Sequence, residues 1–259
     1  MTVIHAPAKL TLSLRVTGVR DDGYHLIDAE MTTLDLHDVL VIEDTHGAID
    51  AGTAPTTSTI QFTGPFATGL VDDGTNLVTK ALRLVKRTAS VVLEKNIPHG
   101  GGLGGGSADA AAILRWAGQP IDLPAVATSL GADVPFCAAG GRARVRGIGE
   151  IIDPIPQKPG VVTLVIPPFS VSTPAVYRAW DELGGPTSEG PNDLEPAALV
   201  VEPRLVAWRD AIAQTTGTSP VLAGSGATWF VVGDHEDELR AGLRARFGDG
   251  AHVIVARHV

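Results

Sequence analysis

The sequence predicts a protein of mixed α and β structure, organised in two domains. Segments with the alternating apolar pattern of strands are interspersed with segments that have the apolar spacing of helices. A chain of 259 residues is long enough for one large domain or two ordinary ones. The composition shifts near Pro154, Pro156 and Pro159, so we place the domain boundary there, between residues 1–157 and 158–259.

The overall composition favours a globular protein with a substantial core, since 44% of the residues are hydrophobic and only 19% are charged. The net charge is −9 and the basic residues are scattered, so we expect no nucleic-acid partner. The start MTVIHAPAKL lacks the pattern of a signal peptide, and no apolar run approaches the ~20 residues of a membrane span, so we expect a cytoplasmic protein. The single cysteine, Cys137, lies in the apolar run VPFCAA and is expected to be a buried hydrophobe.

The N-terminal residues 3–16 are predicted to form a strand with alternating faces. One face carries Leu10, Leu12, Leu14 and Val16, and the other carries Lys9, Thr11, Ser13 and Arg15. By periodicity alone, Lys9 is best interpreted as a solvated lysine.

A turn at residues 20–23 precedes Tyr24 and His25, which fit either a recognition pair for a flat ring or a half-buried strand edge. Segments 29–43 and 58–63 are predicted strands, joined by a polar connection over 46–58. The remaining expected strands are 90–95, 142–146, 161–166, 228–232 and 252–257, and the expected helices cover a segment from Leu77 and the ranges 107–116, 123–130, 174–183, 203–215 and 235–246.

The most informative stretch is the glycine loop, Gly100 to Gly106, interrupted only by Leu103. It follows a predicted strand and precedes a helix that we expect to begin with Ser107 near its N-cap. Glycines allow backbone amides to approach phosphate oxygens closely, and a helix start adds unpaired N–H donors and the positive end of the helix dipole. The loop therefore predicts phosphate binding.

Two alternatives to a phosphate loop stay open, a structural turn and a dinucleotide site. The pattern GxGxxG fits at Gly100, Gly102 and Gly105, but the only acid at the expected distance, Asp122, precedes a helix and does not end a strand. The P-loop pattern fails because no lysine follows the last glycines.

Two further features could serve a site. Asp133 lies between small and apolar residues just past a predicted helix, either as a turn-capping aspartate or as a general base at the edge of a pocket. Residues 221–226 form a second glycine turn, either a tight connection or a backbone lip that faces the first loop.

Three of these stretches carry a resemblance to the GHMP superfamily of small-molecule kinases, which includes galactokinase, homoserine kinase, mevalonate kinase and phosphomevalonate kinase. They are Ala6–Leu10, Pro98–Ala112 and Leu222–Gly226. Within the superfamily the chain most resembles the kinases that act on 4-diphosphocytidyl-2-C-methyl-D-erythritol in the non-mevalonate route to isoprenoid precursors. That closer resemblance is carried by the stretches Asp22–His25, Gly100–Gly106, Gly131–Pro135 and Ser172–Pro174.

The resemblance implies a two-domain α+β fold, an N-terminal ATP-binding domain and a C-terminal substrate domain with the active site in the cleft between them. It implies Mg²⁺-dependent transfer of the ATP γ-phosphoryl group to a hydroxyl of a cytidine diphosphate sugar alcohol, by a monomer or a homodimer. Asp133 would be the catalytic base and Lys9 its positively charged neighbour. The residues implied for ATP are Pro98, Gly100, Gly101, Gly102, Leu103, Gly104, Gly105, Gly106, Ser107, Asn76 and Lys95, with Ser107 as the metal ligand. The residues implied for the acceptor are Thr11, Tyr24, His25, Thr173, Tyr177, Gly224 and Ser225.

The chain departs from the family pattern at two positions. Thr11 stands where the family usually has asparagine, and Ala108 replaces a second serine after the loop. A kinase of the same superfamily with another small alcohol as acceptor is therefore the first alternative. A nucleotide-binding protein without turnover and an NAD-dependent oxidoreductase are the others.

Overall fold

The computed structural model describes residues 1–45, 58–118 and 120–259. The described strands are β1 (Thr2–Val19), β2 (His25–Asp44), β3 (Thr59–Thr63), β4 (Ala89–Glu94), β5 (Arg142–Gly147), β6 (Ile151–Pro154), β7 (Val161–Ile166), β8 (Val221–Leu222), β9 (Trp229–Val232) and β10 (His252–Arg257). The helices are α1 (Leu77–Leu84), α2 (Gly105–Ala117), α3 (Leu123–Ser129), α4 (Val134–Ala139), α5 (Thr173–Glu182), α6 (Glu195–Val201), α7 (Arg204–Thr216) and α8 (Glu236–Phe247).

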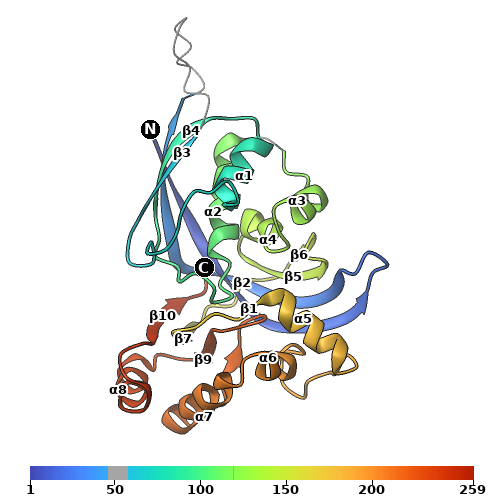
Figure 1. Cartoon of the computed structure of the whole chain (residues 1–259), viewed down its shortest axis with the longest axis vertical. Helices are drawn as coiled ribbons and strands as arrows, with labels where there is room; N and C mark the ends of the chain where they lie inside the picture. The colour runs from blue at the N-terminus through green and yellow to red at the C-terminus, as the bar shows by residue number, and fades with distance from the viewer. Residues whose placement is uncertain (46–57, 119) are drawn as a thin grey trace, which may run out of the picture.

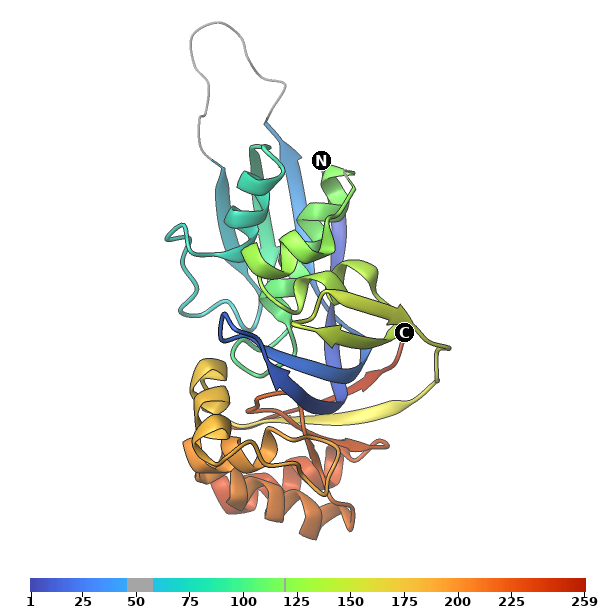
Figure 2. The same ribbon diagram turned by 90° about the vertical axis from the view of Figure 1, so that its right-hand side faces the viewer.

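These elements form two sheets, each covered by its own helices (Figure 1). The first has the order β3-β4-β2-β5-β6, with β1 paired to β2, and helices α1 to α4 lie on one side of it. The second has the order β10-β7-β9-β8, with α5 to α8 around it. Figure 2 shows the long β1–β2 hairpin crossing between the two parts, so this hairpin is the element that both share.

The sheets divide between β6 and β7, on either side of the boundary expected at residue 157, but the apolar cores cross that boundary. One core cluster joins α1 and α2 with Val162, Leu164 and Phe230 of the second sheet. The other joins Leu14 and Ile27 of the hairpin with α5 to α8. The chain end also returns to the first sheet, where the Val259 amide donates to the Thr33 carbonyl at 3.0 Å. Because both cores use the hairpin, they hold the two parts against each other.

The expected elements of regular length are present, with ends that coincide with the prediction or differ from it by at most four residues. The strand expected over 29–43 begins earlier, at His25, so Tyr24 and His25 lie where the hairpin turn meets β2. Four short elements were missed, namely α4, α6, β6 and β8. Each has between two and seven residues, too few for an apolar period to repeat. The connection expected over 46–58 lies, except for Ser58, outside the described residues.

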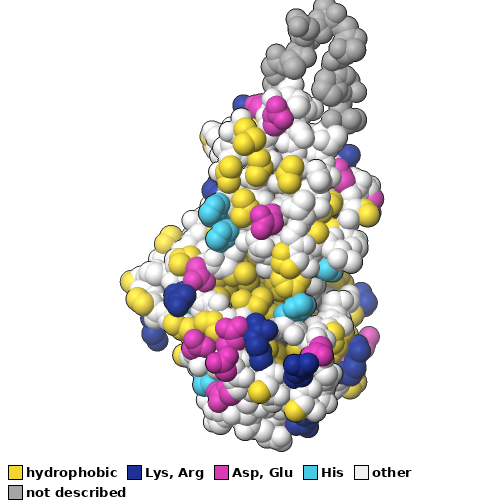
Figure 3. Space-filling view, turned by 90° about the vertical axis from the view of Figure 1, so that its left-hand side faces the viewer, with side chains coloured by type: hydrophobic (Ala, Val, Ile, Leu, Met, Phe, Trp, Pro, Cys, Tyr) yellow, Lys and Arg dark blue, Asp and Glu magenta, His cyan; other side chains and the backbone are white. Residues whose placement is uncertain are grey.

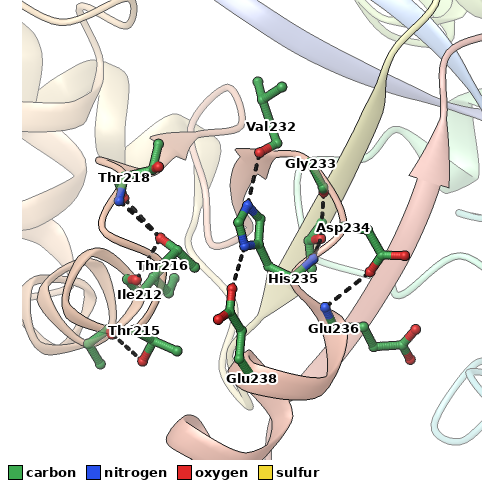
Figure 4. Close-up of polar contacts among 12 residues, drawn as sticks. Ile212, Thr215, Thr216, Thr218, Val232, Gly233, Asp234, His235, Glu236 and Glu238 are labelled. Carbon is green, nitrogen blue, oxygen red and sulfur yellow. Dashed lines mark hydrogen bonds and ion pairs between the residues drawn. The ribbon is translucent and has the colours of Figure 1, made fainter.

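The start of α8 illustrates how side chains fix the helix ends (Figure 4). The His235 ring lies between the Val232 carbonyl, 3.1 Å from Nε2, and the Glu238 carboxylate, and the carboxylate raises the pKa of the imidazole. The Asp234 carboxylate accepts from the Glu236 amide at 3.3 Å. The Asp234 contact takes up one of the backbone N–H donors that a helix start leaves free, and the His235 contacts tie the first turn to the end of β9.

Acidic and basic side chains lie beside one another on the lower part of the surface in Figure 3, where α8 and β10 lie. Two of the ion pairs are Arg240–Glu236, at 2.6 Å, and Arg244–Asp249, at 2.7 Å. The charges of α8 are thus paired rather than collected into a patch of one sign. Among the described residues, no helix combines the length and apolar composition needed to cross a membrane.

Candidate active site

A cavity of about 280 Å³ lies where the hairpin, the glycine loop and the second glycine turn meet. It collects predicted site residues from distant parts of the sequence: Lys9, Thr11, His25, Gly102, Ser107, Asp133, Thr173, Tyr177, Gly224 and Ser225. The rest of its lining is Leu14, Ile27, Met31, Ala132, Ile148 and Leu194, mostly apolar side chains that the sequence analysis did not single out. A largely preformed cavity with a few convergent polar groups is the usual form of a small-molecule site.

The glycine loop enters α2 without a side-chain cap. The N-cap is Gly104, in the left-handed conformation at φ 70°, so the expected cap, Ser107, instead lies in the first turn of the helix and faces the cavity. Left-handed φ is easy for glycine and costly for other residues, which is why a serine does not occupy this position. The first N–H groups of α2 receive no side-chain acceptor and remain available to an anion.

The loop is also packed tightly against the rest of the site. A Cβ on Gly104 would lie 2.7 Å from Cγ of Lys9, and one on Gly102 would lie 2.7 Å from the carbonyl oxygen of Ala223. The Lys9 amide donates to the Leu103 carbonyl at 3.0 Å. Glycine is therefore needed here for close approach as well as for its conformation.

The central polar contact of the cavity joins Lys9 and Asp133. Lys9 Nζ lies 3.2 Å from Asp133 Oδ2 and donates to Thr11 Oγ1 at 3.1 Å. Lys9 is only 4% exposed, so the solvated lysine that periodicity favoured is wrong. The reason is that both faces of β1 are covered at this point, one of them by the glycine loop.

Asp133 occupies the N-cap position of α4, but its side chain makes no capping bond. Its carboxylate points to Lys9 instead, and the side chain retains 32% exposure at the edge of the cavity. Of the two interpretations left open by the sequence, the capping aspartate is therefore wrong. An exposed, lysine-paired carboxylate can accept a proton from a bound hydroxyl.

The second glycine turn forms the opposite lip of the cavity. Ser225 Oγ and Thr173 Oγ1, from the start of α5, are 2.7 Å apart. Buried Asn192 donates to the carbonyls of Leu222, at 2.9 Å, and Gly224, at 2.7 Å, which fixes the turn. The sequence analysis missed Asn192, because nothing local marks an asparagine whose partners are thirty residues away.

Of the residues matched to the base-binding site, His25 and Tyr177 come together and Tyr24 does not. The rings of His25 and Tyr177 have centroids 4.6 Å apart with an interplanar angle of 34°, and His25 Nε2 lies 2.8 Å from Asp181 Oδ1. Tyr24 is 47% exposed, outside the cavity, with the Arg20 guanidinium 5.8 Å from its ring centroid.

Of the residues matched to ATP, only Gly102 and Ser107 line this cavity. The rest of the loop borders it without lining it, and Asn76 and Lys95 have other partners. The Asn76 side chain caps α1 by accepting from the Val78 amide at 2.8 Å. The Lys95 ammonium is buried beneath the glycine loop, bonded to the carboxylates of Asp38 and Asp109. The sequence analysis missed both aspartates. Asp109 could have been marked, because it is the only acid of the alanine-rich helix α2, whereas Asp38 is one of several acids along β2 and has no such signal.

The predicted burial of Cys137 is confirmed. The thiol is 4% exposed, and burial raises its pKa strongly. A thiol in this state is a small core residue and not a nucleophile.

Comparison with known proteins identifies relatives over the whole chain. The family described as GHMP kinases N terminal domain matches residues 76–141. A protein of Paracoccus denitrificans named 4-diphosphocytidyl-2-C-methyl-D-erythritol kinase is 41% identical over 87% of this chain and 84% of its own length. A crystal structure of 4-(cytidine 5'-diphospho)-2C-methyl-D-erythritol kinase superimposes with a TM-score of 0.73 at 30% identity, with both chains covered completely. Mevalonate kinase of L. major shares the fold, with a TM-score of 0.62 at 14% identity over 100% of this chain and 96% of its own.

Proposed function

The chain belongs to the 4-diphosphocytidyl-2-C-methyl-D-erythritol kinase family of GHMP kinases, and from this we propose that it transfers the γ-phosphoryl group of ATP to a hydroxyl of 4-diphosphocytidyl-2-C-methyl-D-erythritol, giving the 2-phosphate. Family membership leaves no basis for the dinucleotide interpretation of the glycine loop. The two-domain division near residue 157 and the active site between the two parts remain part of this proposal.

The observation that carries the proposal is the Lys9–Asp133 pair in a cavity bordered by the phosphate-type loop. In this proposal Asp133 accepts the proton of the attacking hydroxyl. Lys9, 3.2 Å from that carboxylate, stabilises the negative charge that develops on the transferred group. Phosphoryl transfer needs positioning and neutralised charge more than covalent chemistry, so a short list of polar groups is sufficient.

The loop from Gly100 to Gly106 would hold the ATP phosphates through its amides and the start of α2, with Gly224 and Ser225 on the opposite side. Ser107 and Asp133 offer oxygen donors in the same cavity, which is the ligand type that Mg²⁺ prefers, and this ion is commonly held by few protein groups together with substrate phosphates. Ser107 is therefore the proposed Mg²⁺ ligand, and the ion would neutralise phosphate charge.

The cytidine end of the acceptor would lie against Tyr177 and His25, near Thr173. Stacking on an aromatic ring contributes ~1–3 kcal/mol per base. Tyr24 would join the stack only if the hairpin turn moves toward the cavity. Asn76 remains the proposed contact for adenosine, whereas the Lys95 ammonium is already engaged with two carboxylates.

Thr11 supports a specific alternative, a GHMP kinase with a different small alcohol as acceptor. Its hydroxyl accepts from Lys9 Nζ, and it lacks the second hydrogen-bonding group of the asparagine usual in the family. The orientation of the accepting hydroxyl could therefore differ from that in other members.

A coupled ADP-release assay tests the proposal, with ATP, Mg²⁺ and either the diphosphocytidyl acceptor or other small alcohols. Turnover restricted to the cytidine acceptor is the expected result. Turnover only on another alcohol would support the kinase activity and refute the proposed acceptor. ATP binding without turnover on any acceptor would indicate a nucleotide-binding protein that has lost catalysis.

A further inference from the structure

Three charged side chains meet in the core directly beneath the glycine loop. Asp38 comes from β2, Lys95 follows β4, and Asp109 lies on α2, and their side chains are 0%, 4% and 4% exposed. Lys95 Nζ donates to Asp38 Oδ2 and, at 2.6 Å, to Asp109 Oδ2. Burying charges is costly unless they are paired, so this cluster needs a reason beyond general stability.

Asp38 holds the entrance of the loop. Its Oδ1 accepts from the backbone amides of Asn96, at 2.5 Å, and Ile97, at 2.8 Å, the two residues that precede Pro98 and the glycines. The Asp38 carboxylate thus accepts hydrogen bonds from two loop amides and from the Lys95 ammonium.

Lys95 and Asp109 hold the exit of the loop. A Cβ on Gly105, the first residue of α2, would lie 3.4 Å from Lys95 Nζ and 3.1 Å from the Ile97 side chain, so the ammonium lies directly below the helix start. Asp109 is one turn further along the same helix. The cluster therefore ties both ends of the loop to β2.

The two carboxylates are not equivalent. Asp109 Oδ1 is buried without a hydrogen-bond partner, and burial raises the pKa of the Asp109 carboxyl. Despite the opposing effect of burial, Asp109 and Asp38 raise the pKa of Lys95, which stays charged.

We propose that Asp38, Lys95 and Asp109 are positioning residues that act through the glycine loop on ATP, with Asp38 as the anchor of the loop entrance and Asp109 as a second acceptor for Lys95. The inference rests on the proposed function of the loop in holding phosphate. Its competing explanation is a cluster that only stabilises the N-terminal core, which would change stability without changing nucleotide affinity.

The test compares Asp38→Asn with Asp109→Asn in the full chain, with Asp28→Asn as control because Asp28 pairs with Arg144 on the exposed side of the first sheet. The readouts are the Kd of ADP by calorimetry, the KM of ATP, the KM of the acceptor, kcat and Tm.

For Asp38→Asn we expect the Kd of ADP and the KM of ATP to rise about tenfold, since Lys95 loses one carboxylate acceptor and the two amides at the loop entrance donate to a neutral oxygen instead of a charged one. The acceptor KM stays the same. Asp109→Asn imitates the protonated acid and changes both nucleotide constants by less than about threefold, because Lys95 keeps an oxygen acceptor. Asp28→Asn leaves them unchanged.

Two results would overturn the inference. One is an Asp38→Asn protein with a lowered Tm that binds ADP as tightly as wild type, and the other is an equal weakening by both cluster variants. If Asp38→Asn does not fold, Lys95→Arg replaces it in the test, because arginine keeps the positive charge and alters the geometry of the donor. The same rise of about tenfold in the Kd of ADP and the KM of ATP is then expected. Wild-type ADP affinity in Lys95→Arg would refute the inference. A wild-type chain that binds ADP but phosphorylates no acceptor refutes the proposed function alone, and the ADP measurements still decide the role of the cluster.

Discussion

Replacing Gly102 by alanine tests whether the two glycine turns act as one unit. Gly102 has φ +75°, and a Cβ there would lie 2.7 Å from the carbonyl oxygen of Ala223 and 3.0 Å from that of Gly226. Both carbonyls belong to the second turn, which is held by its own hydrogen bonds, including Ala223 N to Thr228 O at 2.9 Å. No side-chain rotation can relieve these contacts, so one backbone must move.

The expected loss of stability has two parts. A left-handed alanine costs about 1–2 kcal/mol, and overpacking against rigid neighbours adds about 1–3 kcal/mol. Gly217→Ala is the matched control: Gly217 has φ +67° at the end of α7, and a Cβ there would meet nothing within 4 Å. The control should therefore show only the first part, about 1–2 kcal/mol.

Urea unfolding followed by circular dichroism measures the free energies of unfolding, and the ADP-release assay measures function. We expect Gly102→Ala to be about 2–5 kcal/mol less stable than wild type and to show an ATP KM about tenfold higher, because the loop amides are displaced. Gly217→Ala should keep the wild-type KM. Equal stability losses in the two variants, or a wild-type ATP KM in Gly102→Ala, would show that the turns do not touch in the working protein.

Three other predictions address the acid–base pair, the base-binding ring and the thiol. Asp133→Asn should lower kcat by about 10²–10⁴-fold with ADP affinity retained, as measured by steady-state kinetics and calorimetry, and intact phosphoryl transfer would remove the base assignment. Tyr177→Ala should raise the acceptor KM roughly 10-fold or more without changing that of ATP, and equal changes in both would refute the stack. Because burial raises the pKa of Cys137, little thiolate forms at pH 8. A thiol reagent should therefore modify the native chain at least about 100-fold more slowly than the urea-unfolded chain, and similar rates would contradict the burial of the thiol.

The longer secondary-structure elements could be predicted because their apolar periods repeat several times. The helix from Arg204 to Thr216 and the strand from His252 to Arg257 were expected within one residue of their observed ends. The six residues of α4 could not be, since the segment VPFCAA is apolar throughout and carries no period. Its existence matters for function, because it determines where Asp133 points.

The residues of the site also fall into two groups, those that the local sequence marks and those whose role depends on a distant segment. The glycine loop is marked by its own composition, so the proposal that it binds phosphate could be made from the sequence. Asn192 and Asp38 could not, because each acts by bonding backbone groups of a distant segment, Gly224 in one case and Ile97 in the other. Such partners are fixed only when the chain is folded.

Lys9 shows why a correct strand assignment can still give a wrong environment. Alternation along β1 separates its two faces, but it does not say what covers each one. The hairpin runs through both core clusters, so near Lys9 the face that should be solvated is covered by Leu103 and Gly104, while Leu10 is buried in the core. We expect a charged side chain at that depth only where its charge has a role. The partner of the Lys9 ammonium is the carboxylate of Asp133, at 3.2 Å. A buried lysine on a strand that two cores share therefore fits the proposed catalytic role better than a role in folding, since an apolar side chain would fill the same space without the cost of burying a charge.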